Sequence, residues 1–195
     1  MAWLELARFR SYRGLSWEPA AEINLLVGPN GAGKTNLLEA IGYLAALRSF
    51  RSVPDEALIT MGAEAAVIRG EVLRGERASL VEVEVPRAGR RRVQVNRHRP
   101  ARSSDLLGVL RVVTFLPEDL DLVKRGSAHR RDFLDQVAVQ LWPTAHLDQQ
   151  EYERALRQRN SFLRQVGPGP VDSVTLAVWD ERLSQAGGRV MARRA

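Results

Sequence analysis

Residues 24–44 read NLLVGPNGAGKTNLLEAIGYL, and this stretch decides the fold. Its glycine-rich centre, residues 28–35, matches the phosphate-binding pattern G-x-x-x-x-G-K-[ST] without a mismatch. The apolar residues before the loop predict a buried strand over Glu22–Val27. After the loop, apolar side chains recur at helical spacing from Gly33 onward, at Leu37, Leu38, Ile41, Leu44 and Ala45. A strand, a glycine loop and a helix in this order distinguish a P-loop from a chance match.

The loop has the chemistry of a triphosphate cradle. Its glycines let the backbone N–H groups turn inward as an anion nest, and the following helix adds its positive N-terminal end. Lys34 is expected to reach the β- and γ-phosphates, and the Thr35 hydroxyl to ligate Mg²⁺. Asn36 is either a buttress of the loop or an ordinary polar residue of the first helical turn. The residues predicted to bind nucleotide, as ATP with Mg²⁺, are Gly28, Pro29, Asn30, Gly31, Ala32, Gly33, Lys34, Thr35 and Asn36.

The composition of the 195-residue chain excludes several classes of protein. With 45% apolar and 27% charged residues it lies in the globular range, so disorder is not expected. The absence of cysteine excludes disulfides, thiolate metal sites and thiol nucleophiles. The N-terminal residues lack the apolar core of a signal peptide, and no apolar run is long enough to span a membrane. We therefore expect a cytoplasmic protein with no membrane partner.

The charge is concentrated in one part of the chain. Residues 87–131 contain twelve basic and four acidic residues, so they carry +8 while the rest of the chain carries −2 of the total of +6. Lysine occurs only at positions 34 and 124, so the loop has lysine in a chain that otherwise uses arginine. A compact ammonium fits between phosphate oxygens where a planar guanidinium does not.

A basic stripe of this kind predicts a polyanion partner, and a nucleic acid is the expected one. The alternative for each arginine is a solvated or structural role: Arg48 and Arg51 could shape the loop that carries them. Arg130 and Arg131 lie early in a predicted helix, against its dipole, so they either pair with acids or bind DNA. The candidate DNA-binding residues are Arg48, Arg51, Arg97, Arg99, Arg102, Arg130 and Arg131. Contacts to phosphate would make the affinity fall steeply with salt and depend little on base sequence.

The predicted elements change in character near residue 120, from strands to helices. Alternating or continuous apolar patterns predict strands over Trp3–Tyr12, Val67–Leu73, Ser79–Val85, Arg91–Asn96 and Val109–Leu116, in addition to Glu22–Val27. A short strand before Pro19 and a helical turn near Asp55 are also expected. Helical spacing then predicts a helix capped by Ser127, a second from Pro143 to about Val166, and a third from Val171 after a GPGP breaker.

Two classes of P-loop protein fit these patterns. A small kinase would carry its loop close to the N-terminus on a parallel sheet, with an arginine-bearing lid. Here 27 residues, including a charged strand, come first, which favours an ABC-type head with an antiparallel β element before the loop. The expected fold is an α/β P-loop head of the ABC/SMC-like type, with a β-rich nucleotide-binding lobe over residues 1–120 and the start of a helical lobe over 121–195. A third possibility is an interaction module that binds ATP without catalysis.

An ABC-type head also needs a signature loop and, further along, an apolar strand that ends in acidic residues and holds Mg²⁺. Residues 174–188, VTLAVWDERLSQAGG, imitate both, but their apolar positions are three and four apart and predict a helix. In VVTFLPEDL, residues 112–120, Glu118 lies either near the γ-phosphate or at a helix N-terminus. We therefore expect the first half of such a head, which binds ATP without hydrolysing it. Its P-loop strand should have an exposed edge, because the flanking strands would come from the other half.

The loop and several segments after it resemble the RecF family of bacterial recombination mediators. The resemblance rests on GPNGAGKTNLLEAI followed by RSFR at Arg48–Arg51, and on FRSY at Phe9–Tyr12. It continues through DEALITMG (55–62), VVTFLPEDLDLV (112–123), RRDFLD (130–135), YERALRQRNSFL (152–163) and Trp179-Asp180, in the family's order and spacing. Ser11 stands where the family usually has Asn, and Ala128 where it usually has Pro.

This resemblance implies an ATP-binding, DNA-binding protein of recombinational repair, replication restart and the SOS response. It implies slow ATP hydrolysis and ATP-dependent dimerisation in complete family members. The implied partners are DNA, either single-stranded or at junctions of single and double strands, and mediators of the RecO and RecR types.

Overall fold

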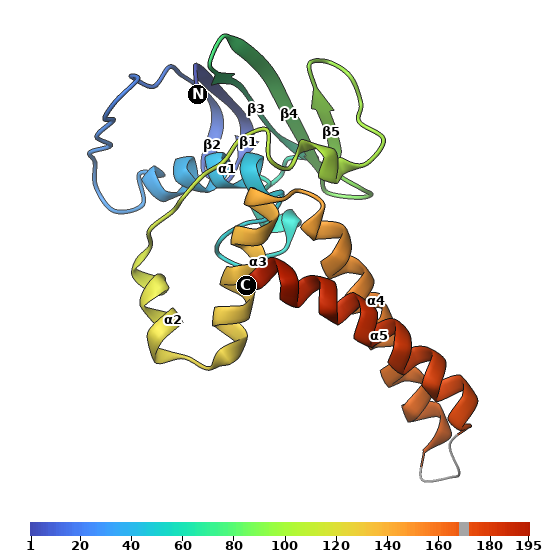
Figure 1. The fold of residues 1–195 in the computed structure, drawn as a ribbon. Coiled ribbons are helices and arrows are strands. Elements are labelled where there is room, and N and C mark those ends of the chain that lie inside the picture. The colour runs from blue at the N-terminus through green and yellow to red at the C-terminus, as the bar shows by residue number, and fades with distance from the viewer. Residues whose placement is uncertain (168–171) are drawn as a thin grey trace. The chain divides into compact units, whose positions relative to one another are not determined.

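The structure, a computed structural model, describes residues 1–167 and 172–195, apart from the side chains of Ser103, Glu118 and Asp121. It divides into two compact units, residues 1–115 and 116–195. The first contains the sheet and helix α1, and the second contains helices α2 to α5 (Figure 1). The predicted GPGP breaker lies mostly outside the described residues, as does Val171, the predicted start of the last helix.

The sheet of the first unit is antiparallel throughout its described part, in the order β2-β1-β3-β4-β5. Its strands are β1 (Trp3–Phe9), β2 (Tyr12–Trp17), β3 (Ala65–Arg74), β4 (Arg77–Pro86) and β5 (Arg92–Val95). One face of the sheet is buried, as the alternation along β4 shows: Val81, Val83 and Val85 are buried while their neighbours are not. The predicted strand from Trp3, the short strand before Pro19 and the three-stranded meander are therefore confirmed.

Helix α1 (Lys34–Ala46) packs on β3 and β4 and completes the core of this unit. Leu37, Leu44 and Ala45 are buried as predicted, together with Tyr43. Leu38 is 44% exposed, so its predicted place on the buried face is wrong. It lies about 100° around the helix from Leu37, which turns it away from the sheet.

Arg91, which directly precedes β5, joins the C-terminal end of α1 to the sheet by hydrogen bonds. Its guanidinium donates to the carbonyl oxygen of Leu47, the C-cap of α1, and to the Tyr43 hydroxyl at 3.2 Å. It also lies 3.7 Å from a carboxylate oxygen of Asp55, in the short 3₁₀ helix η1 (Asp55–Leu58). Burial raises the pKa of Tyr43 well above its ordinary value, so this hydroxyl stays protonated and neutral. One arginine of the basic stripe is thus structural.

Two predicted buried strands are wrong. Glu22–Val27 has no strand hydrogen bonding, and Ile23, Leu25 and Val27 are 88%, 84% and 83% exposed. In Val109–Leu116, Val113 and Phe115 are 99% and 88% exposed. A strand forms only when a neighbour supplies its hydrogen bonds, and no described strand of this chain runs beside either segment. A strand that would pair with either segment is not among the described elements.

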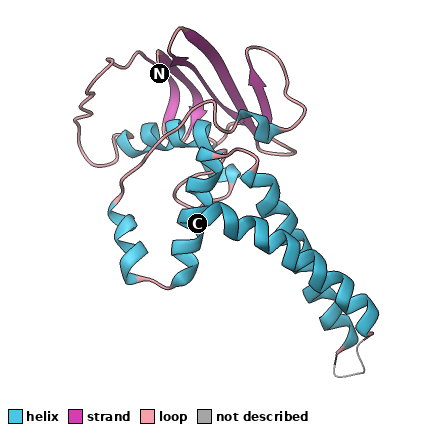
Figure 2. Cartoon of the chain, viewed as in Figure 1, coloured by secondary structure: helices cyan, strands magenta, loops and turns pink. Residues whose placement is uncertain are grey.

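The second unit is helical. Its described elements are η3 (Pro117–Leu120), α2 (Asp121–Lys124), α3 (Ser127–Leu141), α4 (Ala145–Val166) and α5 (Ser173–Arg194); a further 3₁₀ helix, η2 (Ser103–Leu106), belongs to the first unit. Helices α4 and α5 lie side by side along their length (Figure 2). Both predicted long helices are confirmed. The predicted cap at Ser127 is wrong, because Gly126 is the N-cap and Ser127 is the first helical residue.

Ion pairs join these helices. Arg194 of α5 donates two hydrogen bonds of 2.7 Å to the Asp135 carboxylate of α3, and these bonds raise the pKa of Arg194. Arg189 bridges Asp148 and Glu151 of α4 at 3.1 and 2.6 Å. Among the described helices, none is both long and apolar enough to cross a membrane.

The N-cap of α5 gives the second unit a predictable pH dependence. The Thr175 hydroxyl and the Val174 N–H donate to the Asp172 carboxylate and hold the pKa of Asp172 below its ordinary value. A lowered folded-state pKa means that the stabilisation is present above the ordinary pKa and is lost as the pH falls through the lowered one. Acidification should therefore lower the melting temperature of wild type more than that of Asp172→Asn, which keeps an N-cap acceptor without the titration. Melting curves by circular dichroism at several pH values measure this, and parallel curves would contradict it.

Candidate nucleotide site

The glycine loop lies directly before α1, and Lys34 is the first residue of that helix. Gly31 and Gly33 adopt φ values of 84° and 101°, in the left-handed region that favours glycine. The Lys34 ammonium donates to the carbonyl oxygens of Gly28 at 2.7 Å and of Pro29 at 2.8 Å. The lysine therefore lies over the loop, beside the helix end whose free N–H groups favour anions.

Gly33 is closely enclosed by the turn between β1 and β2. The Tyr12 hydroxyl donates to the Gly33 carbonyl oxygen at 3.2 Å. A Cβ atom added at Gly33 would lie 3.0 Å from the Ser11 Oγ and 3.0 Å from the Tyr12 hydroxyl oxygen. The conformation of the loop is thus fixed by residues more than twenty positions earlier in the chain.

Thr35 and Asn36 follow on the first turn of α1. Thr35 is exposed, so its hydroxyl is accessible to a bound ion. The Asn36 side chain donates to the Ser11 Oγ at 3.0 Å and accepts from the Arg51 guanidinium at 3.1 Å. Asn36 therefore joins α1 to both the β1–β2 turn and the segment that contains Arg51.

One turn further along α1, Glu39 forms a buried polar centre that the sequence reading missed. Its side chain has no exposed surface, and its carboxylate accepts from Arg10 at 2.7 and 2.9 Å. Ser49 also donates to it, and Arg51 lies 3.5 Å away. A sign was present in the sequence, since Glu39 is the one acidic residue in the stretch that forms α1.

The candidate DNA-binding arginines differ in their surroundings. Arg48 and Arg51 are both exposed residues, and the Arg51 guanidinium also contacts Asn36 and Glu39. Arg130 donates to the carbonyl oxygens of Leu122 and Arg125 near the end of α2, at 3.4 and 3.1 Å, and Arg131 donates to the Ser127 hydroxyl at 2.9 Å. Arg130 and Arg131 thus donate hydrogen bonds to backbone and hydroxyl oxygens of their own unit.

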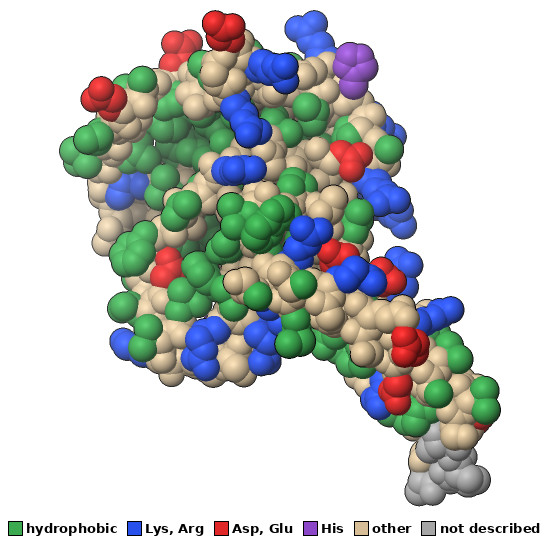
Figure 3. Space-filling view, viewed as in Figure 1, with side chains coloured by type: hydrophobic (Ala, Val, Ile, Leu, Met, Phe, Trp, Pro, Cys, Tyr) green, Lys and Arg blue, Asp and Glu red, His purple; other side chains and the backbone are tan. Residues whose placement is uncertain are grey.

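Arg97 and Arg99 are presented by a tight turn after β5. Backbone hydrogen bonds of 2.9 and 3.0 Å join Val95 and His98, and the two residues between them, Asn96 and Arg97, have φ values of 51° and 65°. Two positive φ values match a type I′ hairpin turn. In the described structure neither Arg97 nor Arg99 has an ion-pair or side-chain hydrogen-bond partner, and both are exposed, as is Arg102. Figure 3 shows Lys and Arg side chains around this end of the sheet.

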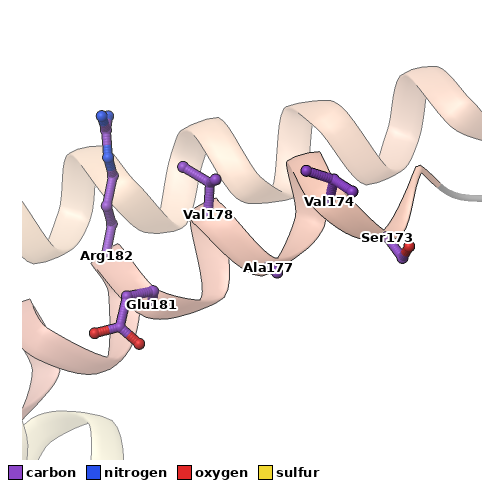
Figure 4. Close-up of a pocket in the computed structure, with 6 residues that line it drawn as sticks. All are labelled: Ser173, Val174, Ala177, Val178, Glu181 and Arg182. Atoms are coloured by element: carbon purple, nitrogen blue, oxygen red, sulfur yellow. The ribbon is translucent and has the colours of Figure 1, made fainter.

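The second unit has a groove on α5. It is lined by Ser173, Val174, Ala177, Val178, Glu181 and Arg182, all from α5 (Figure 4). These residues belong to the segment that imitates a signature and an acidic strand. The segment is helical as predicted, so it is not an apolar strand that ends in acidic residues. The side chain of Glu118, the other acidic candidate, lies outside the described part of the structure.

Comparison with known proteins identifies the family. Residues 1–121 match the sequence model of the RecF/RecN/SMC N-terminal domain. The chain belongs to this family. Among curated relatives, it is 47% identical over 193 residues to the DNA replication and repair protein RecF of Acidothermus cellulolyticus, a match that covers 98% of this chain and 52% of that protein. It is 43% identical over 197 residues to the protein of the same name from Streptomyces avermitilis, covering 98% and 53%. The chain thus spans about half the length of the curated relatives it matches.

Solved structures agree with the family assignment. The recombination mediator protein RecF-ATPrS in the RecFOR pathway superposes with a TM-score of 0.93 at 29% identity, over 99% of this chain and 52% of that one. RecF-ATP in the same pathway gives 0.92 at 29% identity, over 98% and 52%. An SMC ATPase structure, 22% identical over 69% of this chain, shares the fold with a TM-score of 0.56. The predicted resemblance to RecF and the predicted ABC/SMC-like fold are both confirmed.

The kinase alternative finds no support. A small kinase requires a parallel sheet with its loop close to the N-terminus, whereas the described sheet of this RecF-family chain is antiparallel and begins well before the loop. The relatives and structural neighbours are RecF and SMC proteins.

Proposed function

We propose that this chain is the nucleotide-binding part of a RecF-type DNA repair protein, with residues 28–36 as the ATP site. The observation that carries the proposal is the Lys34 ammonium lying over the glycine loop at the N-terminus of α1. Supporting it, two neighbours of matching fold are RecF-ATPrS and RecF-ATP. On this reading, residues 1–120 are a nucleotide-binding lobe and residues 121–195 the start of a helical subdomain.

The residues of the loop fit a Mg²⁺-triphosphate by their chemistry. Gly31 and Gly33 have the positive φ values that an anion nest can use, and Lys34 supplies a point charge with three donors. The exposed Thr35 hydroxyl would ligate Mg²⁺, which when bound neutralises charge on the β- and γ-phosphates. We propose that the chain by itself binds ATP without hydrolysing it, since its sequence has no signature loop and no apolar strand that ends in acids.

We also propose the wider role of the family for the protein that contains this sequence. It acts in the cytoplasm in recombinational repair, replication restart and the SOS response, binding single-stranded DNA or strand junctions. It works with mediators of the RecO and RecR types and forms an ATP-dependent homodimer. The names of the relatives and of the RecFOR neighbours support this role.

Lys34→Ala tests the nucleotide site. Loss of the ammonium should weaken ATP binding about 100-fold or more, because the charge-assisted bonds to phosphate are lost. Isothermal titration of the 195-residue chain with ATP and Mg²⁺ measures the Kd. Lys124→Ala is the matched control, since it removes the chain's other lysine. Equal ATP affinity in Lys34→Ala and wild type would refute the proposed ATP site. Measurable ATP turnover by wild type that Lys34→Ala abolishes would refute the proposal that the chain by itself does not hydrolyse ATP.

The turn after β5 tests the DNA proposal. Replacing Arg97 and Arg99 by Ala should weaken DNA binding alike for unrelated sequences, because phosphate contacts carry no base information. It should also reduce the slope of log K against log salt by about 1.4–1.8, the value for two lost phosphate contacts. Fluorescence anisotropy with labelled oligonucleotides at several salt concentrations measures both.

Arg92→Ala is the matched control for this experiment. Arg92 is also an exposed arginine near the turn, but it donates to Glu84 at 3.0 and 3.1 Å and its charge is compensated. It should therefore change DNA affinity little. An affinity that does not depend on salt, or an equal loss in Arg92→Ala, would contradict the role of Arg97 and Arg99.

A further inference from the structure

The polar centre at Glu39 links three segments that are distant in the sequence. Its carboxylate, fully buried in α1, accepts from Arg10 of the β1–β2 turn and from Ser49 and Arg51 after α1. A buried carboxylate is costly unless it is paired and hydrogen-bonded, and these donors satisfy it. Among the described buried side chains, no polar atom lacks a hydrogen-bond partner. The arrangement is therefore a complete network that fixes the positions of its members.

Arg10 has an unusual backbone that its surroundings hold in place. Its φ of 52° lies in the left-handed region, which is uncommon for a residue other than glycine. Its N–H donates to the Leu58 carbonyl oxygen at 2.7 Å, and its own carbonyl oxygen accepts from the Thr60 hydroxyl at 2.8 Å. Its guanidinium donates to the Ala57 carbonyl oxygen as well as to Glu39. Such over-determined strain is typical of functional sites.

The next two residues, Ser11 of the turn and Tyr12 at the start of β2, reach the glycine loop. Ser11 accepts from Asn36, which directly follows Thr35. Tyr12 donates to the Gly33 carbonyl oxygen, and its ring faces the position of a Gly33 side chain. A path of contacts thus leads from Glu39 through Arg10, Ser11 and Tyr12 to Gly33 and Asn36, two of the residues predicted to bind nucleotide.

We propose that Glu39 is a positioning residue of the nucleotide site. It acts through Arg10, which holds Ser11 and Tyr12 against the loop and so keeps the nest in its binding conformation. Glu39 itself is buried and does not contact nucleotide. The inference rests on the proposed ATP binding at residues 28–36 and adds to it a second set of residues that determines affinity.

Arg51 has the weaker connection to Glu39. Its guanidinium lies 3.5 Å from the carboxylate, against 2.7 Å for Arg10, and its side chain is 37% exposed, against 17%. Charge-assisted bonds are strongest when they are short and paired as a fork. Loss of the forked contact between Arg10 and Glu39 should therefore weaken nucleotide binding more than loss of the Arg51 side chain.

The test is the ATP affinity of Glu39→Gln, which keeps the volume and polarity of the side chain but removes its charge. At a temperature where circular dichroism shows the variant to be folded, its Kd for Mg²⁺-ATP should rise about tenfold, because small displacements of binding groups have large effects. Arg10→Lys keeps the charge and loses the fork, and it should show a similar rise. The double variant Glu39→Gln/Arg10→Lys should bind Mg²⁺-ATP no more weakly than the single variant with the higher Kd, since both substitutions act through one contact. Arg51→Ala should show a smaller rise.

Arg91→Ala is the matched control for instability. It removes a partly buried arginine that binds the other end of α1, so it destabilises the same unit without touching the β1–β2 turn. Its Kd for Mg²⁺-ATP should stay within about twofold of wild type. A Kd increase as large as that of Glu39→Gln would mean that general destabilisation explains the effect of Glu39→Gln, and it would overturn the proposal.

The remaining outcomes separate this inference from the proposed function. If wild type binds ATP, Lys34→Ala does not, and Glu39→Gln binds as wild type does, only the positioning role is wrong. If wild type itself does not bind ATP, the proposed function is wrong and this inference falls with it. Should Glu39→Gln fail to fold, Arg10→Lys decides: wild-type affinity in that variant overturns the proposal, and a tenfold loss supports it.

Discussion

Gly33→Ala is expected to remove measurable ATP binding while leaving the chain folded. The added methyl group would lie 3.0 Å from Ser11 Oγ, 3.0 Å from the Tyr12 hydroxyl oxygen and 3.1 Å from the adjoining ring carbon. At the same time alanine would have to adopt a φ of 101°, which L-residues rarely do. The loop must then change conformation at the residue that joins the nest to α1, and the Kd for ATP should rise about 100-fold or more, the scale expected when binding groups are displaced by about 1 Å.

Gly31→Ala is the matched control for that prediction. Gly31 also has a positive φ, of 84°, but an added Cβ there would meet nothing within 4 Å. Both variants share the conformational cost of about 1–2 kcal/mol for a left-handed residue with a side chain. Titration of each variant with Mg²⁺-ATP should therefore show a much larger loss for Gly33→Ala. Equal losses would mean that the contact with the β1–β2 turn does not matter to the loop.

Arg10→Ala is expected to give the largest loss of stability, about 3–5 kcal/mol in the free energy of unfolding of the first unit. It leaves the Glu39 carboxylate, which has no exposed surface, with Ser49 and the more distant Arg51. Glu39→Ala should cost less, because the guanidiniums of Arg10 and Arg51 are 17% and 37% exposed and can turn toward water. The asymmetry follows from burial, since the partner that cannot reach solvent is the one that is costly to leave unpaired.

The four tryptophans allow the two units to be followed separately. Trp3 and Trp17 lie in the first unit, and Trp142 and Trp179 in the second. In a background with Phe at 142 and 179, urea unfolding followed by fluorescence reports the first unit. Arg13→Ala, which removes an exposed arginine from β2, is the control and should change stability by less than about 0.5 kcal/mol. A loss below about 1 kcal/mol for Arg10→Ala, or an equal loss for Glu39→Ala, would contradict the argument from burial.

The sequence predicted those features that depend on neighbouring residues. The P-loop pattern placed the start of α1 at the glycine loop, and period-two alternation placed β3, β4 and β5. Helical spacing in residues 174–188 correctly excluded an acidic strand there. Each of these signals lies within a short window, where local geometry decides the structure.

The predicted strand at residues 22–27 and the missed pair of Arg10 and Glu39 have a common cause in long-range pairing. Glu22–Val27 has the apolar pattern of a buried strand, but hydrogen bonding to a neighbour decides whether it becomes one. The pair of Arg10 and Glu39 joins residues 29 apart, and it depends on a left-handed arginine that no propensity would suggest. The roles of Arg48, Arg51, Arg97, Arg99, Arg102, Arg130 and Arg131 toward DNA stay predictions, because exposure and charge show where phosphate could bind and not whether it does.

The Arg91 bridge has a consequence for hydrogen exchange. A helix end normally frays, and its amide hydrogens exchange with solvent long before the core opens. Here the C-cap carbonyl of α1 is bound by a side chain from the strand-to-strand connection before β5. The last turn of α1 should thus be released only when the β4–β5 hairpin detaches. Its amides should exchange at the slow rate of the sheet, whereas those of residues 22–27, without strand hydrogen bonds, should exchange within the fastest phase.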